Sequence, residues 1–116
     1  FWVNYQRETE FNPLHVHPSS VYSFVIWMKI PTHHEEQKKL KIASDTNSNS
    51  ISNFAFHYVD ILGKNRGQVY KMSSECEGTM LFFPSDLHHI VYPFYNCQEE
   101  RISLSGNIAI DTSKTF

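Results

Sequence analysis

The sequence predicts an all-β protein, either a β-sandwich or a barrel, with the jelly roll among the candidates. Aromatic residues make up 15% of the 116 residues and, together with β-branched residues, favour sheet over helix. Several short segments alternate apolar and polar residues with the period of two that is typical of half-buried strands. Turn signals separate these segments. The length corresponds to one domain, and we expect residues 1–116 to form it.

Segments with strand character follow one another along the whole chain. In order, they are Phe1–Gln6, Val21–Ile30, Ser52–Val59, Gly67–Met72, Thr79–Phe83 and Arg101–Ile110. In the third segment Phe54, Phe56 and Tyr58 share one face, which is the pattern of a strand with one buried side. The turn signal Gly63–Gly67 lies between the third and fourth segments and predicts that they pair as a β-hairpin.

The stretch Thr32–Ser50 fits more than one structure. Thr32 and Glu35 have the spacing of a helix-capping box, whereas Lys39–Ala43 alternates as a strand does. Both interpretations stay open, so the predicted fold allows one short helix. Asp45–Ser50 consists of small and polar residues, and we expect it to be a loop between elements.

Composition and charge argue against several classes of protein. The formal net charge is −2, and no basic block marks a surface for nucleic acid. No apolar run approaches the roughly 20 residues that cross a bilayer, and no signal peptide is recognisable. The two cysteines lack a CxxC spacing, which favours a reducing compartment. We expect a soluble, cytoplasmic protein without nucleic-acid or membrane partners, and since residue 1 is Phe we allow for an N-terminal extension before it.

Histidines at two places in the chain are candidate metal ligands. His15 and His17 are two residues apart, so in an extended segment their side chains point to the same side. His88 and His89 follow an apolar strand that ends at Pro84, where a barrel turns side chains toward its mouth. Two imidazoles plus a distant third make a facial set, which leaves metal positions open for substrates. Taken alone, such histidines are more often surface or hydrogen-bonded core residues.

A polar face on the last strand segment is a second candidate. The residues that share this face are Arg101, Ser103, Ser105 and Asn107. An ordinary solvent-facing side is the commoner explanation for such a pattern. Beside a metal, however, the Arg101 guanidinium and the Ser103 hydroxyl are groups that bind a carboxylate through charge-assisted hydrogen bonds.

The order of these features resembles a known family. Along the chain stand WVNYQ, then HVHPSS followed by VYSFVIWMKIP, then GTMLFFPSDLHHIVYPF and finally ERISLSGN. This order is similar to that of the 2-oxoglutarate and Fe(II)-dependent oxygenases, most of all to the phage and bacterial group with the motifs H-x-H-P and F-P-S-x-L-x-H. The resemblance covers nearly the whole chain and implies a double-stranded β-helix, which is a cupin-like jelly-roll barrel.

The resemblance also implies the site residues. The implied ligands of Fe(II) are His15, His17 and His89. Of these, His17 stands where most of the superfamily has an aspartate. Arg101 would bind the distal carboxylate of 2-oxoglutarate, and Ser103 would add a hydroxyl. Trp27 falls where many relatives carry a tyrosine that touches the same carboxylate.

The implied activity is hydroxylation of a substrate, coupled to decarboxylation of 2-oxoglutarate to succinate. The cofactors would be Fe(II) and 2-oxoglutarate, and the enzyme would work in the cytoplasm, which is the host's if a phage encodes it. Two alternatives stay open: a non-catalytic binding or structural jelly-roll module, for example of a phage, and a cupin-type dioxygenase with three histidines that does not use 2-oxoglutarate. Arg101 distinguishes them, because neither alternative needs a positive charge in the pocket.

Overall fold

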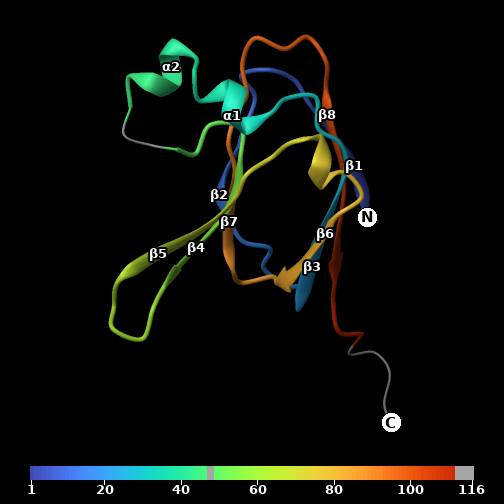
Figure 1. Ribbon diagram of the computed structural model, residues 1–116. Helices are drawn as coiled ribbons and strands as arrows, with labels where there is room; N and C mark the ends of the chain where they lie inside the picture. Colours follow the sequence, from blue (N-terminus) through green and yellow to red (C-terminus); the bar gives the residue numbers. More distant parts are fainter. Residues whose placement is uncertain (47–48, 112–116) are drawn as a thin grey trace.

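The protein is an all-β structure of two antiparallel sheets (Figure 1). The computed structural model describes residues 1–46 and 49–111, so residues 47 and 48 of the predicted loop Asp45–Ser50 lie outside the description, as do residues 112–116. The strands within the described residues are β1 (Trp2–Gln6), β2 (Asn12–His15), β3 (Tyr22–Lys29), β4 (Phe54–Val59), β5 (Asn65–Tyr70), β6 (Met80–Pro84), β7 (His88–Val91) and β8 (Arg101–Ile108). The helical elements there are α1 (His34–Gln37), α2 (Lys41–Ser44) and the 3₁₀ turn η1 (Ser74–Cys76). The predicted fold class is confirmed.

Each sheet has four strands, and the two sheets face each other around an interior (Figure 1). One sheet has the order β1-β8-β3-β6, and the other has the order β2-β7-β4-β5. The last strand, β8, pairs with both β1 and β3, so the first and last strands lie side by side. Two facing antiparallel sheets with neighbours that are distant in sequence agree with a jelly roll.

The interior between the sheets is filled from alternate strand positions. Trp27 on β3 and Phe54 on β4 are each 2% exposed, and their rings meet edge to face with centroids 5.6 Å apart. Phe56 of β4 packs in the same way against Phe83 of β6, with centroids 4.9 Å apart. Both contacts join one sheet to the other. Burial of each such side chain stabilises the fold by about 1.5–3 kcal/mol.

The predicted β-hairpin is present as β4 and β5, which pair in register over their whole length. In the turn, the Asp60 carboxylate accepts hydrogen bonds from two backbone N–H groups at 2.9 and 3.0 Å, and Gly63 takes a positive φ of 79°. The outer half of the hairpin extends beyond the facing sheet (Figure 1). Tyr58 is therefore 47% exposed, although it shares a face with two buried phenylalanines.

The ambiguous stretch forms two short helices, where the prediction allowed one. Helix α1 begins after His33, whose ring Nδ1 accepts a hydrogen bond from the Glu35 N–H at 3.1 Å. The capping residue is thus His33 and not Thr32, whose buried hydroxyl has no partner among the described residues. The strand interpretation of Lys39–Ala43 is wrong, because α2 begins at Lys41, a turn precedes it, and Ile42 is exposed rather than on a buried face. Within the described part of the chain, no helix has the length and apolar character to cross a bilayer.

Strands β2 and β7 are not among the predicted segments. Each has four residues, which is too short for an alternating pattern to stand out. In addition, β2 contains Pro13, a residue found in sheets mainly on edge strands, and β2 is indeed an edge of its sheet. Both strands carry histidines of the candidate site described below.

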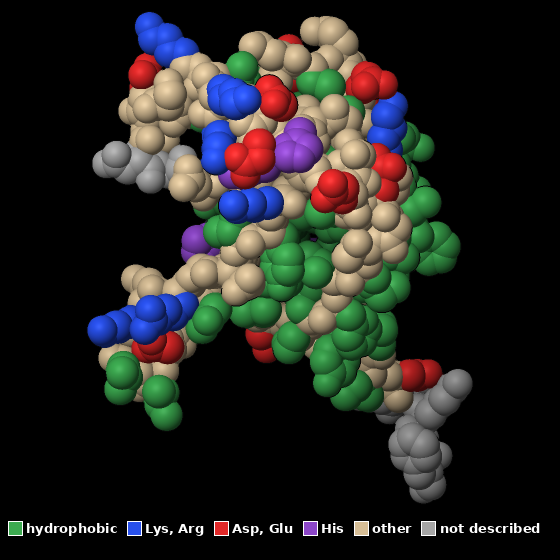
Figure 2. Space-filling view, viewed as in Figure 1, with side chains coloured by type: hydrophobic (Ala, Val, Ile, Leu, Met, Phe, Trp, Pro, Cys, Tyr) green, Lys and Arg blue, Asp and Glu red, His purple; other side chains and the backbone are tan. Residues whose placement is uncertain are grey.

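The outer face of the sheet β1-β8-β3-β6 is largely apolar. Strand residues on this face are Val3, Tyr5, Tyr22, Phe24, Ile26, Met80, Phe82, Ile102, Leu104 and Ile108. Figure 2 shows hydrophobic side chains gathered over this part of the molecule. On the edge strand β6, Met80 and Phe82 are 51% and 56% exposed. Apolar patches of this extent are unusual on a monomeric protein.

We expect the double variant Met80→Lys/Phe82→Lys to bind less of an apolar fluorescent dye and to stay dispersed at higher protein concentration. Two lysines interrupt the apolar face and also discourage edge-to-edge pairing of β6. Since both positions are half-exposed, the free energy of unfolding should change by less than about 1 kcal/mol. The matched control is Ile61→Lys/Leu62→Lys in the hairpin turn, where the two side chains are 100% and 77% exposed. Equal loss of dye binding in the control would show that the sheet face is not the source.

Candidate metal centre

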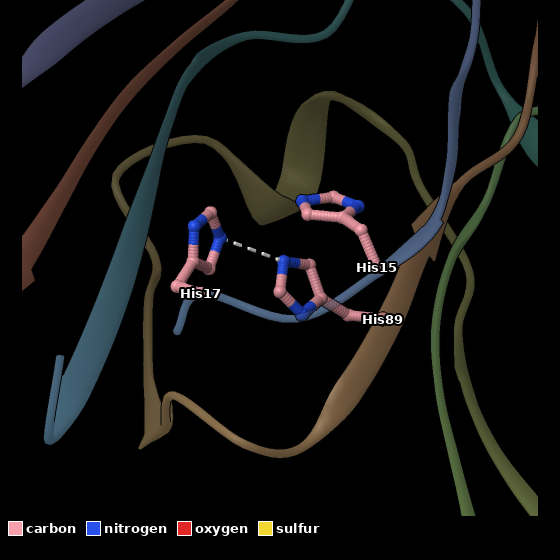
Figure 3. Close-up of side chains that lie close together, drawn as sticks. All are labelled: His15, His17 and His89. Atoms are coloured by element: carbon pink, nitrogen blue, oxygen red, sulfur yellow. Dashed lines mark hydrogen bonds between the residues drawn. The ribbon is translucent and has the colours of Figure 1, made fainter. Parts of the chain in front are cut away.

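Three histidines from distant parts of the chain meet in one cavity (Figure 3). His15 is the last residue of β2, His17 follows in the next loop, and His89 lies on β7. The cavity has a volume of about 280 Å³ and is lined by residues of both sheets. The candidate ligand atoms of the three rings all lie within 4.8 Å of one another. This distance is short enough for one ion to contact all three after small side-chain rotations.

Local backbone contacts hold the histidines in place. His15 lies directly opposite His89 in the antiparallel pair of β2 and β7, with ring centroids 4.1 Å apart. The backbone N–H of His17 donates to the carbonyl of Ser85 at 3.1 Å. The rings of His15 and His17 lie on the same side of the chain, with centroids 5.0 Å apart. The i, i+2 spacing thus places the rings of His15 and His17 together, and the pairing of β2 with β7 places the ring of His89 beside them.

Hydrogen bonds to backbone carbonyls assign the ring nitrogens. His15 Nδ1 lies 2.6 Å from the Pro13 carbonyl, and His89 Nδ1 lies 3.0 Å from the Leu87 carbonyl. A carbonyl oxygen only accepts, so in each ring Nδ1 carries the proton and Nε2 presents a lone pair. This is the usual arrangement of metal-binding histidines, whose second nitrogen is fixed by an outer partner.

The spacing and protonation of the rings suit a metal. Nitrogens bound to one ion at about 2.1 Å lie about 3.0–3.4 Å apart, and Nε2 of His17 lies 3.1 Å from Nε2 of His89 (Figure 3). Burial is the main reason that the pKa of His89 falls to about 4, with smaller contributions from the neighbouring histidines. Burial, followed by the charge of His15, also lowers the pKa of His17. Neutral imidazoles are the form that binds metals.

His88 and Asp86 are close to His89 in sequence but lie outside the histidine cavity. His88 points to the opposite face of β7, is exposed, and faces an open apolar groove together with His57. Asp86 is exposed in the turn before β7 and makes no hydrogen bond to the three histidines. It is therefore a turn residue, and the ring that joins the cluster is that of His89.

Arg101, the first residue of β8, is buried without an acidic partner. It is 1% exposed and forms no ion pair with a described residue. Its Nη2 donates to the Ser52 carbonyl at 2.5 Å and its Nη1 to Gln6 Oε1 at 3.4 Å, while Nε has no partner among the described residues. Burial lowers the pKa of Arg101 to about 10, so the group stays charged at neutral pH. A buried cation with an unused donor favours an anion beside it.

The polar face of β8 points into the interior at this end. Ser103 is 8% exposed, so the solvent-facing explanation does not hold for Arg101 and Ser103. Trp27 of β3 lies opposite Ser103 in the sheet and is buried. Together these three residues line a cavity of about 180 Å³. The fold therefore brings the three residues expected to bind a carboxylate to one cavity.

Two asparagines connect this second cavity to the histidine cavity. Asn4 of β1 and Asn12 of β2 line both cavities. The sequence pattern did not single them out, although Asn4 alternates with Trp2 and Gln6 on a strand whose other positions are apolar. The available signal was the amide side chains of Asn4 and Gln6, which stand two residues apart on an otherwise apolar strand. The two cavities adjoin, and a small molecule lying across the asparagines would reach both.

Comparisons with known proteins agree with this arrangement. A family model described as "Putative 2OG-Fe(II) oxygenase" matches residues 1–107. A search of curated proteins gave no match to the chain. Because the family model covers nearly the whole chain, including both strands that carry the histidines and the strand that carries Arg101, this protein belongs to the 2OG-Fe(II) oxygenase family.

Proposed function

We propose that the protein is an Fe(II)- and 2-oxoglutarate-dependent dioxygenase that hydroxylates a substrate. The observation that supports this most strongly is that two cavities adjoin, one lined by three histidines and the other by Arg101, which is buried and has no ion-pair partner among the described residues. 2-Oxoglutarate carries a metal-chelating keto acid at one end and a second carboxylate at the other. A molecule of this kind lying past Asn4 and Asn12 would meet a matching group at each end.

His15, His17 and His89 would hold the iron through Nε2. The donor set fits, because imidazole nitrogens bind iron and the Pro13 and Leu87 carbonyls hold two of the rings in the required tautomer. Three ligands leave the other positions of the metal open. When bound, iron with 2-oxoglutarate and O2 supplies the oxidising power for hydroxylation, and 2-oxoglutarate is decarboxylated to succinate.

Arg101 would bind and orient the distal carboxylate. Arg101 and Ser103 line the same cavity, so a carboxylate there would accept charge-assisted hydrogen bonds from the guanidinium and the hydroxyl. The buried Trp27 forms part of the wall and excludes water, which strengthens these bonds. The role of these residues is to set the position of the co-substrate relative to the metal.

His17 is a neutral ligand where most of the superfamily has an aspartate. The metal site would then carry one more positive charge, which weakens its hold on hard Fe(II) but increases its attraction for a dianion. Both cysteines are free thiols. A reducing compartment such as the cytoplasm suits both free thiols and ferrous iron.

Anaerobic titration of the protein with Fe(II) and then 2-oxoglutarate tests the proposal. We expect a weak visible charge-transfer band to appear with the second addition and to saturate at one equivalent. The band arises only when the keto acid chelates ferrous iron, so it reports the complete site. Succinate, which lacks the keto group, is the matched control and should produce no band.

The other outcomes identify the alternatives. Bound iron without a band would contradict 2-oxoglutarate chelation and favour a three-histidine dioxygenase of the cupin type. Failure to bind iron at all would favour a binding or structural module. We rank both alternatives second because neither needs the positive charge of Arg101 in the pocket, and Arg101 forms no ion pair with a described residue.

A further inference from the structure

The side-chain amide of Asn4 lies at the junction of the two cavities and contacts two serine hydroxyls. Its Nδ2 donates to Ser105 Oγ at 3.0 Å and to Ser103 Oγ at 3.4 Å. Ser103 lines the Arg101 cavity, whereas Ser105 lines the histidine cavity. A single NH2 group therefore contacts one hydroxyl from the lining of each cavity.

The direction of these hydrogen bonds decides what the serines are able to do. An amide NH2 group only donates, so each hydroxyl must accept from Asn4. A serine hydroxyl has one hydrogen, which is then left to donate to another group. Among the described residues, no group accepts a hydrogen bond from either hydroxyl. Both O–H groups are therefore available to a ligand in the cavities.

We infer that Asn4 is a positioning residue for 2-oxoglutarate, an inference that rests on the proposed function. By donating to both serines, it turns the Ser103 O–H toward the distal carboxylate and the Ser105 O–H toward the keto acid end. The co-substrate is a dianion and needs hydrogen-bond donors at both ends. Asn4 thus acts through Ser103 in the Arg101 cavity and through Ser105 in the histidine cavity.

An aspartate at position 4 reverses this polarity at nearly constant size. A carboxylate only accepts, so the serines would donate to it and have no O–H left for the ligand. Its charge also repels the dianion. The variant Asn4→Asp therefore combines a hydrogen-bond effect with a charge effect, and a control must separate them.

Asn12→Asp is that control. Asn12 lines the same two cavities, and no hydrogen bond joins it to Ser103 or Ser105. We would measure 2-oxoglutarate affinity of the Fe(II)-loaded protein by anaerobic calorimetry. We expect binding to weaken by about 100-fold in Asn4→Asp, since two charge-assisted bonds are lost, and by about 10-fold or less in Asn12→Asp. Iron affinity should not fall in Asn4→Asp, because a negative charge in the lining of the histidine cavity attracts the cation.

A double-mutant cycle tests the inference without an added charge. Asn4→Ala should weaken 2-oxoglutarate binding by about 10-fold in the wild-type background. In a Ser103→Ala/Ser105→Ala background the same substitution should have no further effect, because the hydroxyls that it orients are gone. A merely structural role of Asn4 would instead add to the loss in both backgrounds.

Two results would overturn the inference: equal weakening in Asn4→Asp and Asn12→Asp, or additive losses in the cycle. A defect confined to the Asn4 variants leaves the proposed function intact. If the wild-type protein holds iron but does not bind 2-oxoglutarate, the proposed function is wrong, and the role of Asn4 falls with it. Wild-type binding is therefore measured first.

Discussion

We expect that replacing His89 with alanine prevents the protein from holding iron, whereas replacing His88 with alanine leaves iron binding unchanged. His89 is 4% exposed and its Nε2 lies 3.1 Å from that of His17, so its loss breaks the three-nitrogen set. We expect the affinity for Fe(II) to fall by more than about 100-fold, since even outer-shell changes cost 10–100-fold. Metal content after dialysis, followed by anaerobic Fe(II) titration, measures the effect.

His88→Ala is a closely matched control for this experiment. It changes the same residue type on the same strand, but at a position that points to the opposite face of β7. His89→Phe adds a second test, because it keeps a ring between Phe54 and Phe83 and removes only the nitrogens. Iron retained in both His89 variants, or lost from His88→Ala, would contradict the assignment.

We expect that replacing Arg101 with methionine abolishes 2-oxoglutarate binding and leaves metal binding unchanged. Methionine keeps an apolar stem near the Phe94 ring, over which the guanidinium lies at 5.1 Å, but removes every donor. Loss of a bidentate, charge-assisted pair should weaken 2-oxoglutarate binding by at least about 100-fold. Calorimetry of the Fe(II)-loaded protein measures the affinity, and iron titration verifies that the metal site is intact.

Two further variants show whether a loss of affinity comes from the charge of Arg101, from its planar shape or from the loss of any arginine. Arg101→Lys keeps the charge without the planar fork, so we expect an intermediate affinity. Arg7→Met removes an exposed arginine that directly follows β1 and lines neither cavity, so this variant should bind 2-oxoglutarate as the wild type does. Unchanged affinity in Arg101→Met would mean that the buried guanidinium has a structural role, in which it serves only the Ser52 carbonyl and Gln6.

The strands that were predicted and those that were missed differ in length and burial. The apolar run that contains β3 and the aromatic alternation of β4 fill the core, so their side chains carry a strong signal. Strands β2 and β7 have four residues each, and their place depends on pairing with each other and with β4. The helix cap at His33 was missed because a histidine ring nitrogen replaced the expected threonine hydroxyl.

The sequence by itself determined which side chains share a face. The spacing of His15 and His17 sends both rings to one side, and the alternation of β8 places Arg101, Ser103 and Ser105 together, because strand geometry has a period of two. The alternation of polar and apolar residues, however, separates the two faces of a strand without indicating which of them is buried.

Only the tertiary structure decided which face is inside and which partners meet there. Pairing of β2 with β7 sets His15 opposite His89 and turns His88 away. Packing of β8 between β1 and β3 turns the polar face inward and brings Asn4 against Ser103 and Ser105. The contacts of Asn4 with Ser103 and Ser105 join residues that are 99 and 101 positions apart in the sequence, and the contact of His17 with His89 joins residues that are 72 apart. No local pattern encodes such pairs, because they form only when the two sheets close around a common interior.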